Sequence, residues 1–370
     1  MKLIEILKFA EEYLLKYSFS KPRLEAEKMI AYILKLDRLG LYTNFELEIS
    51  QKEREEIKIY LKKMADSGDS FDKINKEPQV NYKEKNMEFF IKSIEYLKEK
   101  GVADYKLDTE YIFAHVLNVN RTLLSIQLSK EISNEQLELI KKMLIQRGKY
   151  RKPLQQILGE WEFYGYPFKV NENVLIPRSD TENLVENCKH LLLDRESSNI
   201  LDVGTGSGAI AITLGKELKN SKVTGLDISP EALEVAEENK VLNKAENVSF
   251  LLSDVFTALE NSEEKYDLIV SNPPYIPLSE YSELMIEVKQ YEPRGALTDG
   301  GDGYFFYEKI SKEAKDYLKD GGYLAFEVGY NQAEKVSEFM RENGLKGVTI
   351  IKDYCGIDRI VIGMKELKEI

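Results

Sequence analysis

Residues 200–212 have the sequence ILDVGTGSGAIAI, in which a short apolar run ends at a glycine-rich turn. Apolar residues at helical spacing follow through Leu218, so the pattern predicts a strand, a turn and a helix. Glycine lets a ligand approach the backbone closely, and the first turn of a helix carries unpaired N–H groups. We therefore expect a ligand at this turn, in contact with Gly204, Thr205, Gly206, Ser207 and Gly208.

The C-terminal half continues to alternate between strands and helices. The predicted strands are KVTGLDI (222–228), VSFLLSD (248–254), YDLIVSNPPY (266–275), GGYLAFEVG (321–329), VTIIKDY (348–354) and DRIVIGM (358–364). Such alternation is typical of an α/β fold with a doubly wound parallel sheet. The last two strands are too close in sequence for a parallel crossover, so we expect the last one to be antiparallel. Ahead of the sheet, residues 162–177 predict a hairpin that turns at Asn171-Glu172-Asn173.

Acidic residues end the second and third predicted strands. Asp227 lies 19 residues after Gly208, where a carboxylate can accept hydrogen bonds from both hydroxyls of a ribose. Together with the glycine turn, it predicts an adenosine-type ligand at the carboxyl edge of the sheet. Asp254 can accept a hydrogen bond from an adenine amino group, although a helix cap or a turn would explain this residue as well.

The fourth predicted strand ends in Asn272-Pro273-Pro274-Tyr275 at the same edge. Prolines cannot continue a central strand, and they stiffen the loop that carries Asn272 and Tyr275. A planar NH2 group has two N–H donors, which the Asn272 side-chain oxygen and the Pro273 carbonyl can accept, while the Tyr275 ring lies against the planar group. We therefore expect Asn272, Pro273 and Tyr275 to be catalytic and all four residues to bind the substrate. A rigid turn with a solvated asparagine is the structural alternative.

The N-terminal half repeats itself at an offset of 83 residues, without gaps. The matching pairs include Arg38 and Arg121, Leu41 and Leu124, Glu27 and Glu110, and Ala31 and Ala114. Apolar spacing within each copy is helical. Glu53 follows Ser50 by three residues, and Gln136 follows Ser133 by three residues. This spacing is typical of a capping box at a helix N-terminus. Each copy is therefore expected to be a unit of short helices, joined by a polar loop.

The composition excludes several classes of protein. Hydrophobic residues make up 43% and charged residues 31% of the 370-residue chain, which is ordinary for a globular protein of two or three domains. No apolar run approaches the roughly 18 residues of a membrane helix, and the N-terminus predicts an amphipathic helix instead of a signal peptide. Two cysteines, Cys188 and Cys355, and two histidines, His115 and His190, argue against a disulfide framework, a zinc cluster or a histidine base. We expect no metal and a cytoplasmic location.

Charge is unevenly divided between the two halves. Residues 1–150 hold 27 basic and 25 acidic side chains, whereas residues 151–370 hold 25 and 39, a net charge of −14. A domain this acidic repels a phosphate backbone unless a basic strip overrides the field, and the second half contains no Lys/Arg run. Nucleic acid is therefore a disfavoured partner.

Five stretches of the C-terminal half, in this order, resemble the peptide chain release factor glutamine methyltransferases of the HemK type. They are GEWEFYGYPFKVNENVLIPRSDTE (159–182), LDVGTGSGAIAI (201–212), GLDISPEAL (225–233), SNPPYIP (271–277) and EPRGALTDGGDG (292–303). The similarity extends over about residues 88–365. It implies a Rossmann-like, seven-stranded methyltransferase sheet with S-adenosyl-L-methionine as cofactor. It also implies methylation of the glutamine side-chain amide nitrogen in the GGQ motif of release factors, which supports translation termination.

The resemblance further implies roles for single residues. Gly204 to Gly208, Asp227 and Asn272 correspond to cofactor contacts, and Asn272 to Tyr275 correspond to a glutamine clamp. Val255 lies where the family often has an aromatic residue over the adenine. The resemblance therefore adds Asn272 and Val255 to an expected cofactor site that already includes Asp254.

Two features depart from the family pattern. Ser179 occupies the position of a proline in the stretch R-P-D-T-E, and the family usually has a single N-terminal helical unit. The expected domains are an extra helical unit at 1–67, a linker at 68–84, a second helical unit at 85–152, a hairpin and connecting helix at 153–195, and the methyltransferase domain at 196–370. The second unit is expected to dock the release factor. The first could extend that contact, mediate self-association or be a decaying duplicate.

Other functions stay open on the sequence alone. Ribosomal-protein glutamine methyltransferases share almost all of these motifs. N-P-P-Y suits the amino group of adenine equally well, so a nucleic-acid amino methyltransferase is a further alternative, which the charge disfavours. Gly204, Gly206 and Ala209 also fit the dinucleotide fingerprint of a dehydrogenase, but that reading leaves N-P-P-Y unexplained. Outside the enzymes, the alternative is a non-catalytic adaptor that binds nucleotide.

Overall fold

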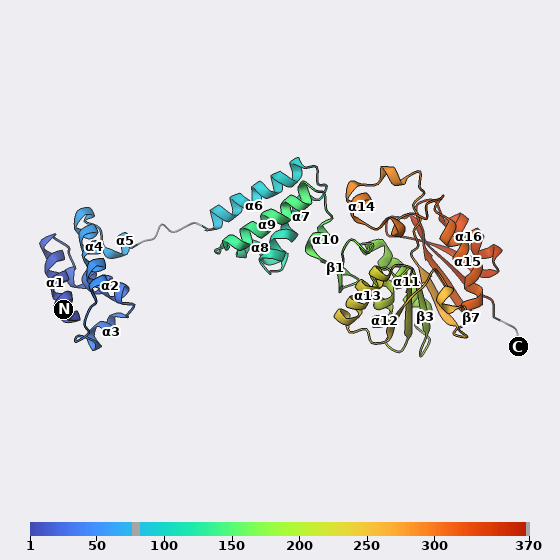
Figure 1. The fold of residues 1–370 in the computed structure, drawn as a ribbon, viewed down its shortest axis with the longest axis horizontal. Coiled ribbons are helices and arrows are strands. Elements are labelled where there is room, and N and C mark those ends of the chain that lie inside the picture. The colour runs from blue at the N-terminus through green and yellow to red at the C-terminus, as the bar shows by residue number, and fades with distance from the viewer. Residues whose placement is uncertain (76–81, 368–370) are drawn as a thin grey trace. The chain divides into compact units, whose positions relative to one another are not determined.

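The computed structural model describes residues 1–75 and 82–367, and the chain falls into two compact units, Met1–Asn86 and Met87–Ile370 (Figure 1). Residues 76–81, which belong to the expected linker, and residues 368–370 lie outside the described residues. None of the described helices combines the length and the apolar character that crossing a membrane would require. The finer division into five ranges stays a prediction.

The first unit is a bundle of helices. They are α1 (Leu3–Lys16), α2 (Pro22–Leu34), α3 (Arg38–Thr43), α4 (Gln51–Ser67) and α5 (Phe71–Ile74). Apolar residues at helical spacing form the core, and Leu3, Leu7 and Leu14 of α1 are buried there. The capping box predicted at the start of α4 is present: the Ser50 hydroxyl accepts a hydrogen bond from the N–H of Glu53, whose carboxylate accepts one from the N–H of Ser50.

A second helical bundle follows, and it repeats the order of the first. It consists of α6 (Tyr82–Glu99), α7 (Tyr105–Val116), η1 (Arg121–Leu123), α8 (Leu124–Gln127), α9 (Asn134–Gly148) and α10 (Leu154–Leu158). Helices begin at matching positions, because α4 starts at Gln51 and α9 at Asn134, while α5 starts at Phe71 and α10 at Leu154. Ser133 caps α9 with the same capping box. The duplication expected from the sequence is thereby confirmed.

The C-terminal part of the chain is an α/β domain around one seven-stranded sheet (Figure 1). The strands are β3 (Asn199–Val203), β4 (Lys222–Asp227), β5 (Val248–Leu252), β6 (Tyr266–Ser271), β7 (Leu318–Glu327), β8 (Leu345–Lys352) and β9 (Asp358–Lys365). The helices are α11 (Ser179–Leu192), α12 (Ala209–Glu217), α13 (Pro230–Asn243), α14 (Ile286–Tyr291), α15 (Phe305–Tyr317) and α16 (Ala333–Glu342), with short turns η2 (Thr257–Leu259), η3 (Tyr281–Glu283) and η4 (Arg294–Ala296). The strand order is β5-β4-β3-β6-β7-β9-β8, and β9 is antiparallel to both neighbours. The doubly wound sheet with an antiparallel last strand is confirmed.

Helices cover both faces of this sheet. Leu268 and Ile269 are consecutive residues of β6, so their side chains point to opposite faces. Leu268 belongs to the hydrophobic cluster that includes Cys188 of α11, and Ile269 to the cluster that includes Tyr307 of α15 and Met340 of α16. A strand buried on both sides is expected to contain a continuous apolar run, as β6 does at Leu268, Ile269 and Val270.

The hairpin ahead of the sheet turns at a different place from the one expected. Strands β1 (Glu160–Phe163) and β2 (Tyr166–Lys169) pair antiparallel, and the turn is Tyr164-Gly165, with φ of 53° and 76°. Two positive φ values match the twist of a two-residue hairpin, and glycine supplies one of them without strain. The expected turn at residues 171–173 is wrong as a hairpin turn. Asn171 instead accepts the N–H of Asn173 (2.9 Å) in a loop beyond β2.

A buried polar joint fastens the second helical bundle to α14. Arg147 of α9 donates to Asp108 of α7 (2.5 Å) and to Glu287 of α14 (3.1 Å). Arg151 forms a second ion pair with Glu287 (2.5 Å). The side chains of Arg147, Asp108 and Glu287 are only 10%, 7% and 11% exposed, so water does little to screen these charges.

Removing the guanidinium from this joint tests its contribution to stability. Arg147→Met introduces the residue that the first copy has at the matching position, Met64. We expect the free energy of unfolding to fall by about 3 kcal/mol, because the variant leaves the buried Asp108 carboxylate without its ion-pair partner, while Glu287 keeps Arg151. Chemical denaturation followed by circular dichroism measures the change.

Lys141→Met on the same helix is the matched control. Its ion pair with Glu138 is exposed on both sides and is worth at most about 1 kcal/mol. Equal stability of the two variants would contradict a structural role for the joint.

Candidate active site

The glycine turn lies between β3 and α12, where the sequence predicts it. Gly204 and Gly206 have φ of 76° and 55°, in the left-handed region that favours glycine. A Cβ atom added at either position would meet nothing within 4 Å, so the backbone here faces open space. Helix α12 begins at Ala209, and because Asp202 accepts the N–H of Ala211, its first turn can offer the N–H groups of Ala209 and Ile210. The turn therefore has room for a ligand, and the helix that follows it supplies donors.

Asp227 at the end of β4 holds this turn in place. One carboxylate oxygen accepts the N–H of Gly206 (2.8 Å), and the other accepts the N–H of Ser229 (3.0 Å). Burial raises the pKa of Asp227, while these backbone donors hold it down. Each oxygen keeps a second lone pair, so the carboxylate can still accept hydrogen bonds from a ribose.

Asp202, beneath the turn, is a residue that the sequence analysis missed. It is fully buried in β3, and one carboxylate oxygen accepts from the Thr205 hydroxyl (2.7 Å) and the N–H of Ala211 (3.2 Å). The other oxygen has no hydrogen-bond partner among the described residues, and burial raises the pKa to about 7. An acid within the apolar run ILDV is the sequence signal that could have identified it.

Most of the predicted ligand residues converge on one cavity of about 400 Å³ at the carboxyl edge of the sheet. Those that line it are Gly204, Gly206, Asp227, Asp254, Val255, Asn272, Pro273 and Pro274. Thr205, Ser207, Gly208 and Tyr275 are not among the lining residues. The size and the mixture of apolar walls with a few polar groups are typical of a small-molecule site.

One end of the cavity is formed by Val255, Asp254 and the start of α15. Asp254 is half exposed and accepts a hydrogen bond from Lys309 of α15 (3.0 Å). Val255 has φ of 52°, which is unusual for a β-branched residue and marks local backbone strain. Phe305 and Phe306 line the same end, and the sequence analysis missed both. These apolar side chains make this end suitable for a flat aromatic ring.

Asn272, directly after β6, lines the same cavity. Its side-chain nitrogen donates to the hydroxyl of Thr181 in α11 (3.2 Å). Its side-chain oxygen is therefore free to face the cavity that Asn272 lines. Pro273 and Pro274 follow it and line the cavity as well.

Tyr275 anchors this loop to neighbouring segments of the domain. Its backbone carbonyl accepts a hydrogen bond from Gln332 (3.0 Å), whose side-chain oxygen accepts the N–H of Gly329 (3.0 Å). Gly303 packs so closely that a Cβ atom there would lie 2.3 Å from the Tyr275 carbonyl oxygen. Burial raises the pKa of Tyr275 to about 12, so its hydroxyl stays neutral. The expected stacking of its ring on the substrate stays a prediction.

Glu292, another residue that the sequence analysis did not single out, holds residues 176–178 in place. Its side chain is 1% exposed and pairs with Arg178 (2.5 Å). The same carboxylate accepts the N–H of Ile176 (3.2 Å). Two stretches far apart in sequence, residues 176–178 and the segment after α14, are thereby held together beside the cavity.

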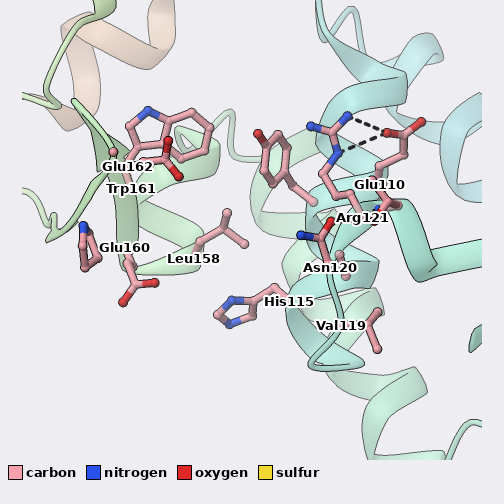
Figure 2. Close-up of a pocket in the computed structure, with 14 residues that line it drawn as sticks. Glu110, His115, Val119, Asn120, Arg121, Leu158, Glu160, Trp161 and Glu162 are labelled. Carbon is pink, nitrogen blue, oxygen red and sulfur yellow. Dashed lines mark hydrogen bonds and ion pairs between the residues drawn. The ribbon is translucent and has the colours of Figure 1, made fainter. Parts of the chain in front are cut away.

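A larger groove, of about 920 Å³, lies between α7 with η1 and the hairpin (Figure 2). Figure 2 shows Trp161 and Glu162 on the hairpin side and Arg121, bonded to Glu110, on the helical side. The Arg121 guanidinium lies 4.4 Å from the centre of the Tyr111 ring. None of the predicted ligand residues lines this groove.

Comparisons with known families agree with the fold. A model described as "Methyltransferase domain" matches residues 194–366, and one described as "PrmC N-terminal domain" matches both residues 5–67 and residues 89–159. The glycine turn, Asp227 and the size of the cavity fit an adenosine-containing cofactor. The chain is an S-adenosyl-L-methionine-dependent methyltransferase.

Two relatives of known family indicate which kind of methyltransferase this chain is. A release factor glutamine methyltransferase of Fusobacterium nucleatum is 54% identical over 339 residues, covering 92% of this chain and 95% of the relative. Another, of Geobacter sulfurreducens, is 40% identical over 268 residues, covering 72% and 92%. The chain belongs to the release factor glutamine methyltransferase family. A crystal structure of the release factor-specific protein-(glutamine-N5) methyltransferase of Alicyclobacillus acidocaldarius is 30% identical, covers 54% of this chain and 99% of that chain, and gives a TM-score of 0.35.

Replacing Asp227 tests the cofactor site. Asp227→Ala removes a carboxylate that both orders the turn and faces the cavity. We expect the Kd for S-adenosyl-L-methionine to rise by roughly tenfold to a hundredfold, the equivalent of one lost hydrogen bond to a charged group. Isothermal titration calorimetry measures it, with Glu237→Ala on the exposed face of α13 as control. Unchanged cofactor affinity would rule out the ribose contact.

Proposed function

We propose that this chain methylates the side-chain amide nitrogen of the glutamine in the GGQ motif of a peptide chain release factor and so supports translation termination. The observation that carries the proposal is the position of Asn272-Pro273-Pro274 on the wall of a cavity whose other walls include the glycine turn and Asp227. A site for a planar nitrogen group and a site for an adenosine-type cofactor thus share one cavity.

The cofactor part of the proposal assigns a role to each wall. When bound, S-adenosyl-L-methionine supplies a reactive methyl group on a sulfonium. The backbone at Gly204 and Gly206 and the carboxylate of Asp227 would hold its polar parts, and Val255 with the start of α15 would contact the adenine. Asp254, paired with Lys309, would lie near the adenine amino group.

The substrate part of the proposal rests on the chemistry of an amide. An amide nitrogen is a poor nucleophile because its lone pair is delocalised into the carbonyl. Asn272 and the Pro273 carbonyl would accept its two N–H bonds and hold the nitrogen at a near-attack distance of about 3–3.5 Å. These hydrogen bonds strengthen as positive charge builds on the nitrogen, so they stabilise the transition state more than the ground state. The spare proton can leave after transfer, so no strong base is required.

Asn272→Ala tests the clamp directly. We expect kcat to fall by roughly 10²–10³, the scale for loss of one preorganised polar contact to developing charge. The measurement is the incorporation of labelled methyl groups into a purified release factor, with a ribosomal protein and DNA assayed in parallel. Asn134→Ala, an exposed asparagine of α9, is the control. A variant that still methylates the release factor at the wild-type rate would refute the clamp.

We further propose that the second helical bundle docks the release factor and that the groove of Figure 2 receives a basic segment of it. The groove has an aromatic floor of Trp161 and Tyr111, whose ring centres are 5.4 Å apart. Glu160 and Glu162 on its rim are exposed, and among the described residues neither has an ion-pair partner. Because the substrate acts on ribosomes, the proposal includes a cytoplasmic location.

Reversing the charge of the rim tests this docking. The double variant Glu160→Lys with Glu162→Lys should raise KM for the full-length release factor about tenfold, because like charges now meet at the rim. The kcat and the Kd for S-adenosyl-L-methionine should stay unchanged. Glu234→Lys with Glu237→Lys on α13 carries the same change in net charge and is the control. If both double variants raise KM equally, the groove has no specific role.

A further inference from the structure

Glu327 is a buried acid beside the proposed clamp, and neither the cofactor site nor the clamp includes it. It ends β7, whose neighbour β6 ends one residue before Asn272. Ser271 pairs with Phe326 across these parallel strands, so Asn272 and Glu327 leave the sheet side by side. Glu327 is only 2% exposed, and its Oε2 atom has no hydrogen-bond partner among the described residues.

The groups around Glu327 come from several elements of the domain. Burial raises the pKa of Glu327 to about 7, while the Thr181 hydroxyl, the positive charge of Arg359 and the Asn272 amide lower it, and the negative charge of Asp180 raises it. The negative charge of Glu327 in turn helps to raise the pKa of the Tyr275 hydroxyl and of the Tyr307 hydroxyl. Its backbone carbonyl is fixed by the Tyr307 hydroxyl (2.9 Å).

The direction of the hydrogen bonds here follows from what each group can donate. An ionised carboxylate only accepts, so Glu327 requires a donor from its neighbours. The Thr181 hydroxyl has a single proton, and its oxygen already accepts from the Asn272 side-chain nitrogen (3.2 Å). That proton is therefore free for Glu327. The Asn272 side-chain nitrogen thus donates to Thr181, and Thr181 donates to Glu327, a chain of hydrogen bonds that we call the relay. The relay occupies the nitrogen of the Asn272 amide and leaves its oxygen for the cavity.

We propose that Glu327 is a positioning residue that, through Thr181, orients the Asn272 amide so that its oxygen faces the substrate. The inference rests on the proposed function, because it assumes that Asn272 receives a substrate N–H. An asparagine amide is nearly symmetric in shape, so packing alone does not distinguish its oxygen from its nitrogen. The Glu327 carboxylate, which only accepts hydrogen bonds, determines which end of the Asn272 amide faces Thr181. It also makes the site select nitrogen groups that carry N–H bonds over groups that only accept.

Glu327 does not contact the substrate in the proposed relay. It is not among the residues that line the cavity, whereas Asn272 is. A direct role as a base would require an open path from its carboxylate to the substrate nitrogen. The relay requires the hydrogen bond from Asn272 to Thr181 and the interaction by which the Thr181 hydroxyl lowers the pKa of Glu327.

Glu327→Gln tests the relay while keeping the shape of the side chain. A glutamine is no longer an acceptor only, because its NH2 group can donate to the Thr181 oxygen; the Thr181 hydroxyl can then donate to Asn272, and the Asn272 amide can reverse. We expect kcat for a release factor to fall at least about tenfold, since a donor then faces a donor. The Kd for S-adenosyl-L-methionine and the melting temperature should stay close to those of the wild type.

The pH profile separates positioning from a purely structural role. Protonation of Glu327 below about pH 7 turns its carboxylate into a donor, so the wild-type kcat should fall as the pH drops through this range. Glu327→Gln should lack this step. An unchanged kcat and an unchanged pH profile in the variant would overturn the proposal.

Two variants of Thr181 keep the test decisive if Glu327→Gln does not fold. Thr181→Ser keeps the hydroxyl and should retain activity, whereas Thr181→Val keeps the shape and should lose it. Equal activity of the two variants would also overturn the relay. If Asn272→Ala is inactive while every Glu327 and Thr181 variant is fully active, the proposed clamp stands and only the positioning role fails. If Asn272→Ala is fully active, the proposed clamp itself fails.

Discussion

The parallel alignment of β4, β3, β6 and β7 brings their carboxyl ends to one edge of the sheet. Asp227 ends β4, the glycine turn follows β3, Asn272 follows β6 and Glu327 ends β7. These groups are far apart in sequence, yet the backbone hydrogen bonds of four neighbouring strands place them in a row. A shift of one residue in any strand would turn its last side chain to the other face, so the sheet register sets the geometry of the site.

The edge is rigid because buried polar groups tie its loops to one another. Asp227 binds the glycine turn, Gln332 binds the carbonyl of Tyr275, and Glu292 binds Arg178. Burying such groups costs free energy unless each is paired. Asp202 and Glu327 each keep one carboxylate oxygen without a partner among the described residues, and burial raises the pKa of each to about 7. Groups of this kind concentrate at functional sites, since a core built for stability alone would replace them with apolar residues.

The parts of the site that the sequence predicts are those encoded within a few consecutive residues. Neighbouring residues are enough to identify the glycine turn, Asp227 at a strand end and Asn272 before two prolines. Thr181, Glu292 and Gln332 do not, because each matters through a partner more than 50 residues away in the chain. The predicted position of the hairpin turn is wrong for a related reason. Asn171-Glu172-Asn173 has strong turn chemistry, but strand pairing on either side of Tyr164 decides where the chain reverses.

The two helical copies separate the residues that make the fold from those that make an interface. Their cores correspond position by position, as at Leu41 and Leu124 or Ile57 and Ile140, all of which are buried. The side chains of Arg147 and Gln156 join the second copy to α14. At the matching positions the first copy has Met64 and Lys73, and its Glu25 accepts the backbone N–H of Phe71 in place of an arginine. The core requirement is therefore intact in both copies, while the side chains that fasten a copy to the catalytic domain are present in the second and replaced in the first. Since the first copy keeps a well-packed core without the joint, its fold does not depend on an attachment of that kind.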